Sequence, residues 1–229
     1  MGCYQSREHY EWRSSELAIS EFLTYTQLAS LSLEFTCEQV KKLSRGSVIP
    51  KGSVPILPMV LRIKVTPALL RMFSEFGQNK PEILSDKTTT GLLVDKILMF
   101  AALICNGSAQ EKLEALFAIY DKSRGGYMTT NEAEGLLRDC LWVHLKLIPE
   151  HSAEHAVNFV QGERLKEYSA VLQSMFKPAV ENFTRQLMYR DRIGFGEFVD
   201  QMNGNHLKML LDGSELRRFL IKRLERTLL

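Results

Sequence analysis

The sequence predicts an all-α protein, and three observations support this fold class. Apolar residues recur at spacings of three and four along most of the chain, which is the periodicity of an amphipathic helix. No alternating run is long enough for a strand of ordinary length, so only short β-pairs inside loops are expected. Hydrophobic residues make up 45% of the 229, which is enough apolar material for a folded core.

Cap residues and helix breakers set the expected order of the helices. Thr36 precedes a helical pattern and has Gln39 three residues later, at the capping-box spacing. Thr66 followed by Pro67 favours another start, because proline suits the first helical position. Residues 109–120 carry apolar side chains at i, i+3, i+4 and i+7. The expected helices are 13–31, 36–44, one beginning at Thr66, 91–105, 109–120, 130–146, 151–175, 178–188, 195–202 and 214–229.

Composition and charge argue against several classes of protein. The net charge of +2 argues against a nucleic-acid binder, which needs a strongly basic surface. The four cysteines are far apart and form no CxxC pair, so they predict a reducing cytosol rather than disulfides or zinc. Residues 1–12 lack the apolar core of a signal peptide. The longest apolar stretch, 97–105, is about half of the roughly 20 residues that a membrane span needs.

The sequence does not predict an enzyme. It contains no phosphate loop GxxxxGK[ST], no zinc helix HExxH and no nucleophile elbow GxSxG. His151 and His155 are four residues apart and, with Glu154 between them, could share a metal on one helix face. Two ligands are weak support for a metal site, so we interpret the pair as part of a solvated helix face.

The first six residues carry a lipidation signal. Met-Gly-Cys-Tyr-Gln-Ser fits M-G-x-x-x-[ST], so Gly2 is the predicted myristoylation site and Ser6 ends the motif. Cys3, beside it, is a predicted palmitoylation site. One acyl chain binds a membrane only marginally, whereas two chains hold stably. We therefore expect a cytoplasmic protein that is associated with the cytosolic face of a membrane.

The segment 111–137, EKLEALFAIYDKSRGGYMTTNEAEGLL, has the order helix, acidic loop, helix. It resembles the third EF-hand of calcineurin B, of calcineurin-B homologous proteins and of neuronal calcium sensors. The resemblance implies EF-hand-like paired helix-loop-helix units, to which this chain adds N-terminal, inserted and C-terminal helices. Loop positions 1, 3, 5, 6, 7, 8, 9 and 12 fall on Asp121, Ser123, Gly125, Gly126, Tyr127, Met128, Thr129 and Glu132.

The loop 121–132 predicts weak calcium binding at best. Oxygen count and ligand charge set the affinity of such loops, and Gly125 supplies no side chain while Lys122 and Arg124 add positive charge. We expect no cofactor, or one weakly bound Ca²⁺. The favoured alternative is a scaffold turn, in which Asp121 caps a helix and Glu132 bonds backbone amides. The candidate ligands are Asp121, Ser123, Tyr127 through its carbonyl, and Glu132.

A second segment, RIGFGEF at 192–198, resembles the end of a partner loop. Ile193 falls on position 8, the position at which Met128 of the first loop would pair with it, and Glu197 falls on position 12. Counting back places Met188 and Arg190 at ligand positions, so this loop is expected to bind no calcium. Residues 34–60 and 66–105 are weaker matches to two earlier units.

The last segment predicts a basic amphipathic helix that starts at Ser214. Three alternatives remain open: it lies on an anionic membrane, it folds back into the protein's own groove, or it binds a partner. The expected contact residues are the apolar stripe and the basic residues beside it. They are Leu216, Phe219, Leu220, Leu224, Arg217, Arg218 and Arg223.

The hypothesis from the sequence is a non-enzymatic, membrane-tethered regulatory adaptor. It would bind a helix of another protein in an apolar groove or through the C-terminal helix. Two alternatives are a calcium-blind structural subunit of a large assembly and a true calcium sensor acting through 121–132. The expected parts are 1–12, lipidation signal and flexible N-terminus; 13–105, N-terminal helical lobe; 106–205, EF-hand-like pair with an insertion at 147–176; and 206–229, C-terminal helix.

Overall fold

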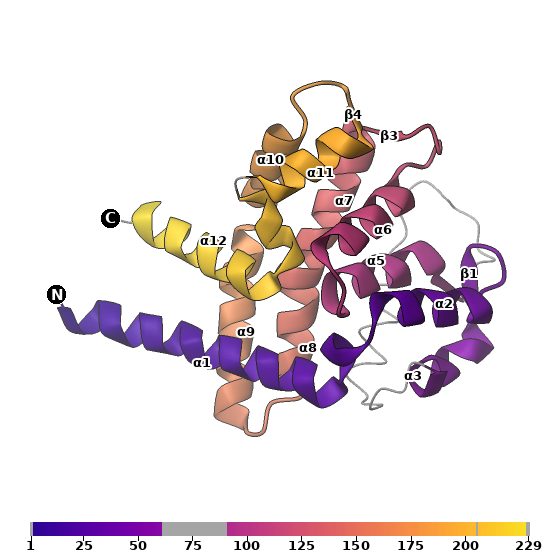
Figure 1. The fold of residues 1–229 in the computed structure, drawn as a ribbon. Helices are drawn as coiled ribbons and strands as arrows, with labels where there is room; N and C mark the ends of the chain where they lie inside the picture. The colour runs from indigo at the N-terminus through magenta and orange to yellow at the C-terminus, as the bar shows by residue number, and fades with distance from the viewer. Residues whose placement is uncertain (1, 61–90, 205, 228–229) are drawn as a thin grey trace. The chain divides into compact units, whose positions relative to one another are not determined.

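The computed structural model describes residues 2–60, 91–204 and 206–227, and these are mostly helical (Figure 1). The all-α class is therefore confirmed. The predicted helix that begins at Thr66 lies outside the described residues. The chain divides into two compact units, one formed by residues 1–23 and 120–229 and the other by residues 24–119.

The unit of residues 24–119 combines helices with one short pair of strands. Its elements are the end of α1 (Gly2–Thr26), η1 (Leu28–Ser30), α2 (Leu33–Leu43), β1 (Val48–Pro50), η2 (Lys51–Ile56), α3 (Leu57–Val60), β2 (Gly91–Leu93), α5 (Val94–Ile104) and α6 (Ala109–Tyr120). Helix α2 packs against α5. Strands β1 and β2 are antiparallel, with Ile49 opposite Leu92 and both side chains buried.

Helix starts near the N-terminus differ from the predicted ones. Helix α1 begins at Gly2, although the sequence predicts a flexible segment before residue 13. Helix α2 begins after Ser32, whose Oγ accepts a hydrogen bond from the Phe35 N–H at 3.3 Å. Thr36, the predicted cap, lies buried inside α2, and its hydroxyl donates to the Ser32 carbonyl at 2.9 Å. The cap is therefore four residues earlier than predicted.

The unit of residues 1–23 and 120–229 contains a second short pair of strands. Its elements after α1 are β3 (Tyr127–Thr129), α7 (Thr130–Trp142), the π-helix η3 (Val143–Leu147), α8 (Ile148–Glu154), α9 (Phe159–Ser174), α10 (Phe176–Leu187), β4 (Arg192–Gly194), α11 (Phe195–Asn203), η4 (Leu207–Leu211) and α12 (Gly213–Thr227). Strand β3 pairs antiparallel with β4. In the pair, Met128 lies opposite Ile193 and both are buried, as the loop positions predict.

The inserted segment is two helices rather than the predicted single helix at 151–175. Helices α7 and α8 are joined through the π-helix, at whose end the Ile148 N–H donates to the Val143 carbonyl, five residues back. The next residue, Pro149, has no N–H and begins α8 within its first turn. The chain then turns, and Asn158 caps α9 by accepting from the Gln161 N–H at 2.9 Å. Helices α8 and α9 pack against each other.

Candidate functional site

The loop 121–132 is closed by its own first side chain. Asp121 is 7% exposed, and its carboxylate accepts hydrogen bonds from the Ser123 hydroxyl (3.0 Å), the Gly125 N–H (3.1 Å) and the Gly126 N–H (2.7 Å). Gly126 has φ of +79°, a conformation that favours glycine. The predicted sharp turn at Gly126 is therefore confirmed.

Glu132 joins the two ends of this loop. Its Oε1 accepts from the Lys122 N–H at 3.1 Å, and its Oε2 accepts from the N–H and the hydroxyl of Thr129, both at 2.8 Å. The Thr129 hydroxyl accepts in return from the Glu132 N–H, which completes the capping box of α7. Glu132 bonds backbone amides as predicted. The helix cap, however, is Thr129 and not Asp121.

Both carboxylates of the loop are stabilised in their charged form. Burial by itself raises the pKa of Asp121, but hydrogen bonds from Gly126, Ser123 and Gly125 hold it below its ordinary value. Burial acts in the same way on Glu132, and the hydrogen bonds from Thr129 and from the Lys122 N–H again lower the pKa. Hydrogen bonds from within the loop therefore stabilise the negative charge of both carboxylates.

The predicted calcium ligands of the loop 121–132 are engaged with one another and with the loop backbone. Ca²⁺ takes six to eight oxygens; here the Ser123 hydroxyl donates to Asp121 at 3.0 Å, and Glu132 accepts from the Lys122 and Thr129 amides. At Gly125 an added Cβ would lie 2.8 Å from a ring carbon of Tyr127, so the position is tight for a ligand side chain. In the described ranges, no group of three or more His, Cys, Asp or Glu side chains could hold a metal ion.

The second predicted loop, 186–197, is partly helical. Gln186 lies in the last turn of α10 and Met188 is its C-cap residue. Arg190 is exposed, with its guanidinium 5.1 Å from the ring centre of Tyr189. Glu197 lies in the first turn of α11. The predicted ligand positions are therefore distributed over α10, the turn that follows it and α11.

Helix α12 folds back onto its own unit, which is one of the three alternatives for the C-terminal segment. Leu216 and Leu220 are buried, and so is Ile221, which the predicted stripe omits. The Phe219 ring lies 4.4 Å from the His206 ring, and Leu224 is half-buried. The packing partners are η3, η4 and α9. Leu216 and Leu220 of the stripe therefore pack into the protein itself, while Phe219 and Leu224 are only half-buried.

Arg217 does not lie on the exposed basic face that the sequence predicts. It is 3% exposed, and its Nε and one terminal nitrogen donate to the two oxygens of Glu16 on α1, at 2.6 and 2.8 Å. Tyr168 on α9 also donates to Glu16. The other terminal nitrogen of Arg217 donates to the His144 carbonyl at 3.2 Å. In the turn that follows, the Ile148 N–H donates to the Val143 carbonyl, and the next residue is proline, which has no N–H.

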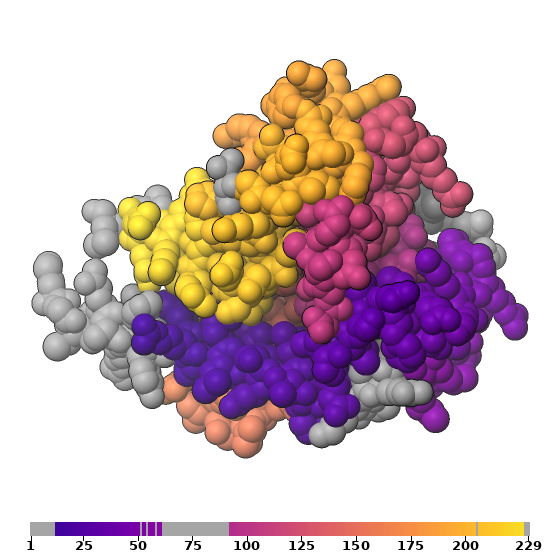
Figure 2. Space-filling model, viewed as in Figure 1, coloured from indigo at the N-terminus to yellow at the C-terminus, as the bar shows by residue number. Residues whose placement is uncertain are grey.

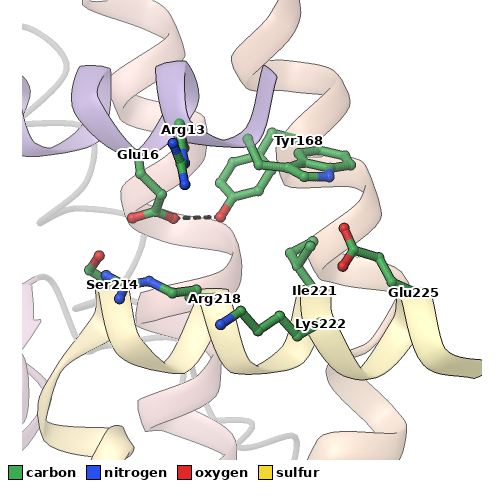
Figure 3. A pocket seen from close by; sticks show the side chains of 9 residues that line it. Arg13, Glu16, Tyr168, Ser214, Arg218, Ile221, Lys222 and Glu225 are labelled. Carbon is green, nitrogen blue, oxygen red and sulfur yellow. Dashed lines mark hydrogen bonds between the residues drawn. The ribbon is translucent and has the colours of Figure 1, made fainter. Parts of the chain in front are cut away.

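Arg218 and Arg223, by contrast, are exposed as predicted. Arg218 lies at a cavity of about 350 Å³ between α1, α9 and α12. Figure 3 shows this cavity with Arg13 extending from α1 toward α12 and the Ile221 side chain rising from α12 toward Tyr168. The lining residues are Trp12, Arg13, Glu16, Tyr168, Ser214, Arg218, Ile221, Lys222 and Glu225.

Sequence reasoning missed the Glu16 cluster and this cavity, because their residues are up to 201 positions apart. One signal was present in α12. Arg217 precedes Leu220 by three residues and Ile221 by four, so it shares their helix face. A basic residue in phase with a buried stripe needs a buried partner, and that requirement points to a carboxylate elsewhere in the fold.

An exposed apolar surface lies where α8 turns into α9. Val157 is 87% exposed, Phe159 80% and Val160 59%. We call these three residues the α8–α9 corner. Figure 2 shows the salmon-coloured atoms of this part of the chain at the lower edge, beside α1. Such clustering of large apolar side chains on a surface is typical of contact sites.

His151 and His155 do not form the predicted solvated face. His151 is 3% exposed, and its Nδ1 lies 3.4 Å from a carboxylate oxygen of Glu154. His155 follows the end of α8, and its ring centre is 5.6 Å from that of Phe22 on α1. His151 therefore lies within α8, whereas His155 lies in the turn that follows it.

The predicted lipidation residues, Gly2 and Cys3, are the first two residues of α1. None of the described helices is long and apolar enough to cross a membrane. Comparisons with known proteins identify no relative: no protein-family model matches the chain, and no significant match was found among curated proteins or solved structures.

Proposed function

We propose that this chain is a non-enzymatic regulatory adaptor of the EF-hand type, tethered to the cytosolic face of a membrane by lipids on Gly2 and Cys3. The main support for the proposal is that the loop 121–132 pairs with the second EF-hand-like segment, 192–198. Met128 and Ile193 hold the same position in their loops, and they lie opposite each other in the β3–β4 pair. The resemblance at 111–137 and 192–198 implies this register.

The pair β1–β2 extends the same argument to the first half of the chain. It joins the segments 48–50 and 91–93, which lie in the two weaker EF-hand-like units. If Ile49 and Leu92 each hold loop position 8, Lys42 falls on position 1 of the first loop and Lys96 on position 12 of the second. Both are positions at which a calcium-binding loop needs an oxygen ligand. Two paired units without acidic ligands fit a fold that is retained for binding proteins rather than calcium.

The surface proposed for the partner is the α8–α9 corner, and not the C-terminal helix, in whose stripe Leu216 and Leu220 are buried. Three adjacent large apolar side chains with exposed fractions above one half offer a contact without rearranging the core. A partner helix with an apolar face is the expected ligand of such a surface.

The test uses the full chain produced in eukaryotic cells, with cross-linking and mass spectrometry. Phe159→Ser with Val160→Ser should remove one stoichiometric partner, because both side chains are exposed and their loss leaves the fold intact. Tyr189→Ser is the matched control, since Tyr189 is another large side chain, 56% exposed, outside the corner. Equal recovery of partners by all variants would contradict the proposed surface.

Calcium titration separates the adaptor from the calcium sensor. By calorimetry, we expect no saturable heat at micromolar Ca²⁺, because Gly125 supplies no side-chain oxygen and Lys122 and Arg124 add positive charge to the loop. Binding that Glu132→Gln abolishes would favour the sensor. The remaining alternative, a structural subunit, predicts that nearly all of the protein occurs in one large, stable complex on size-exclusion chromatography of cell extracts.

A further inference from the structure

The cavity between α1, α9 and α12 has an excess of positive charge. Arg13, Arg218 and Lys222 line it, and among the described residues none of the three forms an ion pair. Glu16 does not balance them, since Arg217 occupies both of its oxygens. Glu225 is the one other carboxylate of the lining. A ligand that fits these walls is therefore an anion.

The rest of the lining is apolar and aromatic. Trp12 and Tyr168 are in contact, with ring centres 5.2 Å apart, and Ile221 forms the wall opposite them. Figure 3 shows Lys222 and Arg218 along α12 next to this apolar part. A volume of about 350 Å³ is at the lower end of the range of small-molecule sites.

The Glu16 cluster makes the cavity a fixed structure. Tyr168 donates to Glu16, and the bidentate contact with Arg217 fixes α1 against α12. The aromatic wall is therefore held in place before any ligand arrives, which reduces the entropy cost of binding.

From this arrangement we infer that the cavity binds an amphiphilic anion of the fatty-acid class. The carboxylate contacts Arg218, Lys222 and Arg13, and the start of the alkyl chain packs against Trp12, Tyr168 and Ile221. The assignment does not depend on the proposed adaptor function, because it concerns a different surface from the α8–α9 corner. The proposed ligand is a free molecule that the cavity takes up from solution.

Trp12 provides a direct readout. Trp12 and Trp142 are the two tryptophans of the chain, so Trp142→Phe leaves Trp12 as the only emitter. Dodecanoate, titrated below its micelle concentration, should change the Trp12 emission saturably. Dodecanol lacks the charge and acetate lacks the chain, so both should bind at least about tenfold more weakly. Equal binding of dodecanol, or no change with dodecanoate, would overturn the inference.

Charge variants test the residues. Arg218→Gln with Lys222→Gln should weaken dodecanoate binding at least about tenfold. Both side chains are exposed, so circular dichroism should be unchanged. Arg226→Gln is the control on the same helix, outside the lining. An equal loss in the control would show that only general charge attracts the anion, and the inference would fail.

Vesicles distinguish a free fatty acid from a membrane lipid. Phosphatidylcholine vesicles with and without phosphatidylserine are added to the same single-tryptophan protein. A response to dodecanoate in the absence of vesicles supports the inference. A response to phosphatidylserine vesicles with none to dodecanoate would assign the cavity to an acidic bilayer lipid and overturn it.

Discussion

Arg217 and Glu16 form an ion pair in which both partners make further hydrogen bonds. Two nitrogens of Arg217 donate to Glu16 and a third donates to the His144 carbonyl, while Tyr168 also donates to Glu16. Burial by itself lowers the pKa of Arg217, but its contacts with Glu16 reverse this and raise it. Burial and the neighbouring Glu16 charge raise the pKa of Tyr168 far above its ordinary value. The cluster is therefore fully protonated on its donors at neutral pH.

Removing Arg217 should be costly. Arg217→Met leaves the Glu16 carboxylate without its cation and removes the hydrogen bond to the His144 carbonyl, so we expect a loss of about 3–5 kcal/mol in the free energy of unfolding. Arg218→Met is the control on the exposed side of the same helix, with an expected change within about 0.5 kcal/mol. Urea unfolding measures both. Similar small losses in the two variants would show that the pair contributes little.

The loop carboxylates should make stability depend on acid. Because the folded pKa of Asp121 and of Glu132 lies below the ordinary values of 3.8 and 4.5, their contribution is present above those values and is lost as the pH falls. From about pH 6 to about pH 3, Tm should fall less in Asp121→Asn with Glu132→Gln than in the unaltered protein. Glu167→Gln, exposed on α9, is the control. Parallel pH curves in all three proteins would contradict this.

At the scale of the elements, helix periodicity was sufficient to find most helices but not their ends. Residues 109–120 form α6 with the predicted bounds, because their apolar spacing is regular. The break between α8 and α9 has no proline or glycine in residues 155–158 to indicate it. The π-helix at 143–147 has no sequence signal beyond the proline that follows it at 149.

The candidate site was predictable only where its residues are close in sequence. The positions of Asp121, Gly126 and Glu132 follow from one segment, and the structure places them in one loop. The Glu16–Arg217 contact and the cavity between α1 and α12 depend on packing between distant segments. No periodicity in one helix specifies which partner it meets.

Helix α12 offers a test of its start. Asp212 Oδ1 accepts from the N–H groups of Ser214 and Glu215, at 3.0 and 3.1 Å, so Asp212 caps the helix, two residues before the predicted start at Ser214. Asp212→Ala should cost about 1 kcal/mol and speed amide exchange in the first turn of α12. Ser214→Ala should change the free energy of unfolding by no more than a few tenths of a kcal/mol and should leave amide exchange in the first turn unchanged. Hydrogen exchange of residues 214–216 measures this, and equal effects of the two variants would rule out Asp212 as the cap.

At the scale of the whole chain, each unit contains one short antiparallel strand pair that joins two loops. In both pairs the central residues are apolar and buried, so the join depends on apolar contact and strand hydrogen bonds. For the adaptor that we propose, control of its activity would come from where the protein is held.

Location in turn should depend on the first two residues of α1. Gly2→Ala removes the predicted acceptor of the myristoyl chain, so the protein should move from the membrane fraction to the cytosol. Cys3→Ser leaves one acyl chain, which binds a bilayer with an association constant of only about 10⁴ M⁻¹, so a partial shift is expected.

Cys37→Ser is the control. Cys37 is half-buried in α2, and burial raises the pKa of its thiol despite the nearby Lys41, which makes it a poor acceptor. Fractionation of eukaryotic cells, with intact-mass analysis of each variant, measures both location and acylation. An unmodified N-terminus on the unaltered protein, or a membrane fraction unchanged by Gly2→Ala, would rule out a lipid tether.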